Sequence, residues 1–147
     1  MAYNTYSFAD LNGVISCPGF ISIPLTGAAV GQGNINISLT DNNTVHDRSA
    51  DGHVMISKIK SDIGEISLEI HQTSPLNTAL IKLYNFLIAA PSATWATIGI
   101  NFDTVLGLPE IVNCTGVSFS KRADKPYQNE GQNITWNFMA ASIKYVL

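Results

Sequence analysis

Charged residues are scarce in this sequence. Asp, Glu, Lys and Arg make up 13% of the 147 residues, about half of the ~25% that is usual for soluble domains. The net charge of −3 is opposite in sign to the basic face that grips phosphates, so a nucleic-acid-binding protein is not expected. Polarity comes instead from 13 Asn, 13 Ser and 11 Thr. Because charges are depleted at the centres of protein interfaces, we expect part of this surface to lie against other chains.

Long apolar runs and closely spaced cysteines are also missing. The longest wholly apolar run, residues 86–90, is far shorter than the ~20 residues of a membrane-spanning helix. The first residues contain no Lys or Arg and no apolar stretch of signal-peptide length. We therefore expect that the chain does not associate with a membrane and that the mature chain begins in the cytoplasm. Cys17 and Cys114 stand far apart, so we expect two buried, apolar thiols and no zinc site.

Motifs for catalysis, metal binding and cofactor binding are absent as well. Residues 41–52 are rich in Asp and Asn, but an EF-hand needs Gly at position six and Glu at position twelve, where this chain has His46 and Gly52. The other histidines, His53 and His71, do not complete a zinc-protease spacing. There is no GxSxG elbow, phosphate loop or dinucleotide fingerprint. The sequence therefore predicts no catalytic residue, no cofactor and no metal, and an enzyme is not expected.

β-branched residues dominate what is present. The chain has 17 Ile and 8 Val against 11 Leu, a balance that favours strands over helices. Apolar residues alternate with polar ones over residues 34–40 and 65–70, which predicts two half-buried strands. We expect a mainly β fold, a small β-sandwich or barrel with one α-helix, as a single domain over residues 1–147. Five further strands are predicted at 11–17, 53–59, 94–102, 111–120 and 132–140.

One segment predicts the helix. Ser74 is a good N-cap, Pro75 suits the first helical position and Pro91 ends the pattern, which gives a helix over about residues 75–90. Its apolar surface is wide, so it either packs only on its own sheet or also touches a neighbouring subunit. The predicted packing face consists of Leu76, Leu80, Leu83, Tyr84 and Leu87.

The longest predicted loop covers residues 41–52, between two predicted strands. A loop of about 12 residues without regular structure is usually functional or mobile. Its candidate contact residues are Asp41, Asn42, Asn43, Thr44, Val45, His46, Asp47, Arg48 and Asp51.

Two other groups of residues leave alternatives open. Lys121, Arg122 and Lys125 surround Asp124 and form either a turn that contacts a partner or a solvated loop. Trp95 and Trp136 lie on predicted strands. Exposed tryptophans on a β-sandwich would suit a carbohydrate-binding module, whereas tryptophan in a strand is more often part of the core.

The order of these pieces resembles the tail tube proteins of contractile-tailed bacteriophages. The matching parts are the stretch 6–10 (YSFAD) before the first strand, the Ala-Asp-Gly end of the acidic, Asn-rich loop at 50–52, the junction TSPLN at 73–77 before the helix, and the C-terminal strand around 133–140. Relatives vary where this chain has His-Asp-Arg in the middle of the loop.

The resemblance implies a structural virion protein. Hexameric rings would join their inner strands into a β-lined channel and stack into the tail tube, with residues 41–52 as the contact between rings and both chain ends at subunit boundaries. The implied partners are further copies of the chain, the sheath, tape-measure, baseplate and tail-terminator proteins, with DNA passing through the lumen without specific binding. The implied location is the virion tail, after assembly in the host cytoplasm. A carbohydrate-binding module or a secretion-system tube protein of related fold stays an alternative.

Overall fold

The computed structural model describes residues 7, 11–25, 33–104 and 111–146. Within these ranges the chain is mainly β with one α-helix, which confirms the predicted fold class. The elements are β1 (Leu11–Ser16), β2 (Ile23–Pro24), β3 (Asn34–Leu39), β4 (Thr44–Arg48), β5 (Val54–Lys58), β6 (Gly64–His71), α1 (Pro75–Ala89), the 3-10 helix η2 (Ser92–Thr94), β7 (Ile98–Thr104), β8 (Ile111–Phe119), β9 (Asn133–Ala140) and β10 (Ser142–Val146).

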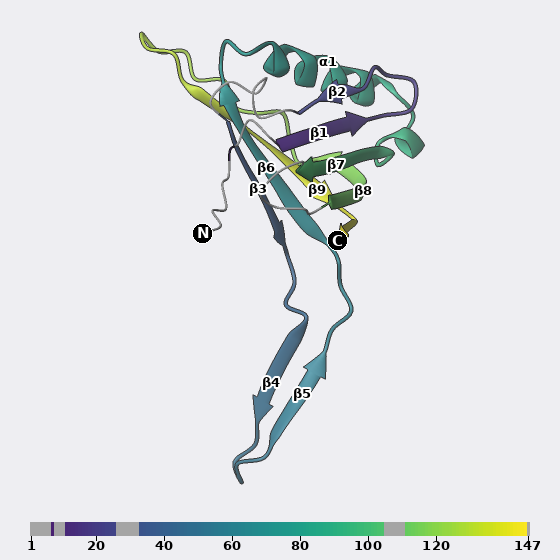
Figure 1. The fold of residues 1–147 in the computed structure, drawn as a ribbon, viewed down its shortest axis with the longest axis vertical. Coiled ribbons are helices and arrows are strands. Elements are labelled where there is room, and N and C mark those ends of the chain that lie inside the picture. Colours follow the sequence, from purple (N-terminus) through teal and green to yellow (C-terminus); the bar gives the residue numbers. More distant parts are fainter. Residues whose placement is uncertain (1–6, 8–10, 26–32, 105–110, 147) are drawn as a thin grey trace, which may run out of the picture.

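The strands form one large antiparallel sheet and one separate ribbon. The large sheet has the order β2-β1-β7-β8-β9-β6-β3, and β10 also pairs with β8. Strands β9 and β10 follow each other along β8, because Phe138 lies opposite Phe119 and Ser142 lies opposite Thr115. Strands β4 and β5 pair only with each other and project far from the rest of the chain (Figure 1).

The core lies between the sheet and α1, which runs along the end of the molecule that also holds β1 and β2 (Figure 1). Alternate residues of β6 and β9 point into it and are almost fully buried, whereas Met139 of β9 lies on the opposite face and is exposed. Phe119 is central, with its ring 5.6 Å from Trp136 and 4.8 Å from Phe138. Asn77 is one of the few buried polar residues, and its Oδ1 accepts a 3.0 Å hydrogen bond from Trp136 Nε1.

Helix α1 has the signals that the sequence predicted. Ser74 is the N-cap and its Oγ accepts a hydrogen bond from the Leu76 backbone N–H at 3.2 Å. Pro75 occupies the start of the helix, where its missing N–H costs nothing. Of the predicted packing face, Leu76, Leu80, Leu83 and Leu87 are buried within the chain, and Tyr84 is half-buried against the rings of Trp95 and Phe119.

Three strands escaped the sequence prediction, and one predicted strand begins later than expected. β2 is only two residues long, and the sequence of β4 has no alternation of apolar and polar residues. β10 was hidden because Ala141, opposite Gly116 (φ +62°), interrupts the alternation. The prediction that Trp95 lies on a strand is wrong. Trp95 ends η2, where local hydrogen bonds such as Thr97 Oγ1 to the Thr94 carbonyl compete with strand pairing, and β7 begins at residue 98.

The buried pair of Asn77 and Trp136 yields a stability prediction. Asn77→Ala leaves the Trp136 indole N–H buried without an acceptor, which typically costs ~1–3 kcal/mol. We therefore expect a lower free energy of unfolding in urea denaturation followed by tryptophan fluorescence. The exposed helical neighbour Thr78→Ala is the control. Equal stability of the two variants would contradict the role assigned to this hydrogen bond.

Candidate assembly site

A long hairpin contains the residues that the sequence singled out. Its proximal half pairs β3 with β6, from Asn34↔Glu69 to Leu39↔Gly64. Its distal half pairs β4 with β5 and is called the ribbon, residues 44–58, from here on. Between the two halves the arms stay in contact, since the Thr40 N–H donates to the Ile63 carbonyl at 2.9 Å. The ribbon therefore continues the large sheet outward, beyond the core (Figure 1).

The expectation of an irregular loop over residues 41–52 is wrong. Five of its residues form β4, and only residues 49–53 make the turn to β5. The strand was hidden because the sequence there, Thr-Val-His-Asp-Arg, has no alternation of apolar and polar residues. Such alternation arises when one face of a strand is buried, and every residue from Thr40 to Ile56 is exposed.

The ribbon exposes large apolar side chains on both of its faces. Ile56 and Met55 are 65% and 62% exposed, and Val54 and Val45 are exposed as well. Residues directly opposite share a face, so Ile56 lies beside His46 on one face and Met55 lies beside Asp47 on the other. An isolated two-stranded ribbon is at best marginally stable in water, and clustered exposed apolar groups mark interaction sites. The ribbon has the properties of a surface that is completed by another chain.

The base of the ribbon is held by a side-chain contact. The Ser61 hydroxyl donates to Asp41 Oδ2 at 2.9 Å, and the Ile59 N–H donates to the Asn43 carbonyl at 2.8 Å. Of the predicted contact residues, Asp41, Asn42 and Asn43 thus lie at this base rather than at the tip.

The tip is organised around the Asp51 carboxylate. It accepts hydrogen bonds from the Ser49 hydroxyl, from the His53 backbone N–H at 3.3 Å, and from His53 Nδ1 at 2.8 Å. Gly52 adopts φ +92°, a left-handed conformation that glycine accommodates easily. The hydrogen bonds from Ser49 and then from His53 hold the pKa of Asp51 below its ordinary value.

Asp47 and Arg48 are the remaining charged residues of β4. Within the described part of the chain, the ion pairs are Asp51 with His53 and Lys121 with Asp124. Asp47 and Arg48 take part in neither pair, and both are exposed. Their charges are available to groups outside this chain.

A second surface is the uncovered face of β3, β6 and β9. The register places Asn34, Glu69 and Thr135 in one row across these strands, and Asn36, Ser67 and Asn137 in the next. The opposite face of the same strands carries the apolar residues of the core. Polar side chains therefore cover this face except at Met139, which is 46% exposed, and the acidic groups among them are Glu65 and Glu69.

The cysteines and tryptophans that the sequence singled out are buried or half-buried. Cys17 and Cys114 are buried as predicted, and burial raises the pKa of Cys114 to about 11, which keeps it a neutral thiol. Trp136 is 1% exposed and cannot stack on a sugar, and Trp95 is half-buried against Tyr84. Tyr127 and Tyr145, which the sequence analysis did not single out, are the exposed aromatic residues in the described part of the chain, at 82% and 55%.

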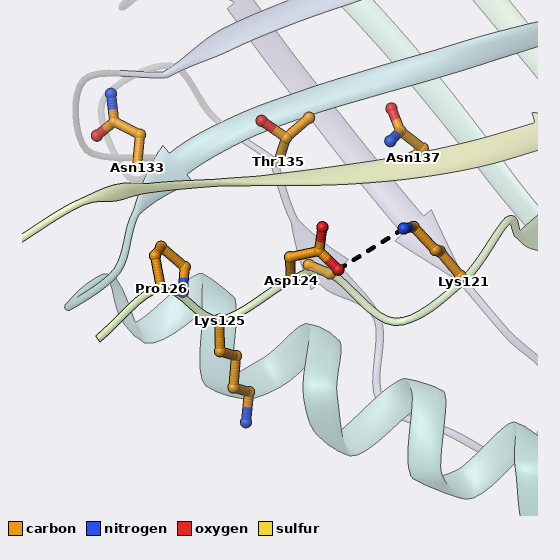
Figure 2. A pocket seen from close by; sticks show the side chains of 8 residues that line it. Lys121, Asp124, Lys125, Pro126, Asn133, Thr135 and Asn137 are labelled. Carbon is orange, nitrogen blue, oxygen red and sulfur yellow. Dashed lines mark ion pairs between the residues drawn. The ribbon is translucent and has the colours of Figure 1, made fainter. Parts of the chain in front are cut away.

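The described residues contain no group of three or more His, Cys, Asp or Glu side chains that could hold a metal ion. No helix among them combines the length and apolarity needed to cross a membrane. The basic side chains of Lys121, Arg122 and Lys125 are exposed, and Lys121 and Lys125 line an open groove beside β9 (Figure 2).

Comparison with solved structures shows which known proteins share this fold. Over its full length the fold is similar to a chain described as the sheath/tube terminator of an extracellular contractile injection system called PVC, with a TM-score of 0.61 and 11% identity, covering 100% of both chains. It is also similar to a chain in the baseplate of the anti-feeding prophage, with a TM-score of 0.59 and 12% identity, covering 99% of this chain and 97% of that one. A third, from the PVC sheath-tube complex, has a TM-score of 0.56 and 10% identity, covering 97% and 91%. At such identities the likeness shows a shared fold.

The chain thus shares its fold with chains of contractile injection systems. The sequence itself matches the family model of the bacteriophage PhiTE tail tube protein over residues 3–147, and the chain belongs to that family. No curated protein sequence matches it. The predicted family resemblance is confirmed, and the chain has a structural role in a tail. Of the motifs that suggested it, the stretch at 6–10 lies outside the described residues except for Ser7.

The tip of the ribbon yields a pH prediction. Because its folded-state pKa is lowered, Asp51 stabilises the turn above the ordinary pKa of 3.8, and this contribution is lost as the pH falls through the folded-state value. Ser49→Ala removes the largest cause, so the pKa of Asp51 should rise toward 3.8 in a carboxyl NMR titration. Ser57→Ala, elsewhere on the ribbon, is the control. An unchanged Asp51 titration in Ser49→Ala would contradict this account of the turn.

Proposed function

We propose that this chain forms hexameric rings that stack into the inner tube of a contractile tail, the conduit through which DNA leaves the virion. The observation that carries the proposal is the ribbon, which extends beyond the core and exposes apolar side chains on both faces. Membership of a tail tube family and the likeness to chains of contractile injection systems support the same reading. The function is mechanical rather than catalytic.

The ribbon is the proposed contact between stacked rings. Ile56 and Val54 on one face and Met55 and Val45 on the other would each be covered by a neighbouring copy. Asp47 and Arg48 are proposed to pair with charges on that neighbour. Exposed ion pairs typically contribute only ~0–1 kcal/mol each, so their repetition around a ring matters more than a single pair.

The polar face of β3, β6 and β9 is the proposed wall of the channel. Its uncharged side chains offer few strong contacts to a passing polyanion, and Glu65 and Glu69 repel phosphates. The core covers the opposite face of these strands, so this is the face of the sheet that is free to meet the lumen. DNA and, during assembly, a tape-measure protein would pass it without specific binding.

The remaining partners follow from the place of a tube in a contractile tail. A sheath surrounds it, a baseplate and a terminator close its ends, and assembly takes place in the host cytoplasm. A tube protein of a contractile injection system that carries no DNA is the second candidate, favoured by the structural likeness to the PVC and anti-feeding prophage chains. Recovery of packaged DNA from particles built with this protein separates the two candidates.

The first test removes the ribbon. Replacing residues 44–58 by Asn-Gly, a favoured two-residue hairpin turn, should leave rings intact and abolish tubes, as seen by negative-stain electron microscopy of the purified protein. A milder variant, Ile56→Asp, should shorten tubes because it buries a charge between rings. Ile21→Asp is the matched control, since Ile21 is 82% exposed but lies outside the ribbon. Normal tubes from the ribbon replacement would refute the assignment of the inter-ring contact.

The second test reverses the charge of the proposed lumen. In particles carrying Glu65→Lys with Glu69→Lys, attraction to phosphates should slow DNA ejection, measured as the rate of DNA release after triggering. Thr78→Lys with Asn85→Lys adds positive charge to exposed positions of α1 and should leave the rate unchanged. Equal ejection rates for both pairs, in particles with intact tails, would show that the two glutamates do not face the passing DNA.

A further inference from the structure

A loop projects from the end of the molecule opposite to the ribbon (Figure 1). It spans residues 126–132 and is called the end loop from here on. β6 separates the two projections. Its first residue, Gly64, follows the arm that leads in from the ribbon, and its last residue, His71, lies opposite Asn133, which follows the end loop. The ribbon and the end loop therefore extend from opposite ends of one strand.

Gln72 holds the base of the end loop on both sides. Its backbone N–H donates to the Gln132 carbonyl at 3.0 Å, and its Nε2 donates to the Pro126 carbonyl at 3.0 Å. Its Oε1 accepts from the Gln132 N–H at 3.4 Å. Because both ends of the loop are tied to the residue that follows β6, the sheet sets the direction in which the exposed residues 127–131 project.

The end loop exposes one large aromatic ring and one charge. Tyr127 is 82% exposed, and tyrosine is among the residues that are enriched in protein interfaces. Glu130 is the charged residue of the loop and is exposed, and it belongs to neither of the two ion pairs in the described part of the chain. An aromatic ring and a free carboxylate on one loop suit a partner that offers apolar and cationic side chains.

One face of the ribbon offers such side chains. Opposite residues share a face and alternate residues return to it, so the register places Arg48 and Lys58 on the face that exposes Ile56 and Val54. Neither β4 nor β5, both described throughout, has an acidic residue on this face, because Asp47 lies on the other one. This face, called the cationic face below, is therefore both apolar and positively charged.

We propose that the cationic face of the ribbon receives the end loop of a copy in the next ring, with Tyr127 packed on Ile56 and Glu130 paired with Arg48 or Lys58. This inference rests on the proposed stack of rings and names the surface that the ribbon meets there. A head-to-tail contact joins two different surfaces, so rings stacked in one orientation bring the ribbon end of β6 to the opposite end of β6 in the next ring. That end holds the end loop.

Charge exchange tests the ion pair. Glu130→Arg should shorten tubes in negative-stain electron microscopy, because it places a third cation against the two on the ribbon. Adding Arg48→Glu and Lys58→Glu to this variant should restore the tube length. Asp103→Arg makes the same change of charge at an exposed position of β7 and should leave tubes unchanged. Normal tubes from Glu130→Arg, or tubes that stay short after the exchange, would overturn the ion pair.

Disulfide cross-linking tests the contact directly. Tyr127→Cys is mixed with Ile56→Cys, and assembled material is mildly oxidised and analysed without reductant. We expect mixed dimers, because packed side chains bring these positions within the Cβ separation of a disulfide. Met55→Cys is the matched control for Ile56→Cys, since the two residues are 62% and 65% exposed but lie on opposite faces of the ribbon. Ile21→Cys, 82% exposed like Tyr127, is the control for the end loop.

The outcomes separate this contact from the stacking of rings itself. Tubes without mixed dimers, or with equal yields from either control, would overturn the contact alone. Oxidised wild-type protein measures the background from the two buried cysteines. Circular dichroism establishes that the variants fold, and the charge exchange decides if the cysteine pair does not assemble. Absence of tubes in the wild-type protein would overturn the proposed function and this inference with it.

Discussion

The double ladder of β6 is the constraint on which the rest of the structure depends. β6 pairs with β9 from Gly64↔Ala140 to His71↔Asn133 and with β3 along the opposite edge. This arrangement buries the apolar positions of β6 against α1 and turns the intervening polar positions to the uncovered face. Because β3 and β6 continue into β4 and β5, the same ladder also aims the ribbon away from the core.

Close packing supports this ladder at its end. Gly64 lies where an added Cβ would stand 2.5 Å from the Ser38 carbonyl oxygen and would also overlap the Ile143 side chain. The absence of a side chain therefore lets β3, β6 and β10 approach one another at the base of the ribbon. The contact of Ser61 with Asp41 lies just beyond this point. These contacts at the base set the direction in which the ribbon leaves the sheet.

The exposed surfaces of the folded chain have different roles in the proposed assembly. The ribbon offers apolar groups on two faces, and the polar face of β3, β6 and β9 offers few strong contacts. An exposed apolar ribbon is a cost and a hazard for an isolated chain. In the proposed tube, neighbouring copies would cover the ribbon, and the low content of charged residues fits such contacts.

The sequence by itself determined the class of the fold, because each signal was local. Ser74 and Pro75 set the start of α1, and strict alternation marked β3 and β6, whose apolar positions are buried or half-buried except Leu39, which is 37% exposed. Only the tertiary structure decided the site. β4 carries no alternation because neither of its faces is buried in the chain, and the groove beside β9 arises where the chain leaves the sheet after β8. Burial within one chain leaves a periodic pattern of apolar residues in the sequence, whereas an exposed ribbon leaves no such pattern.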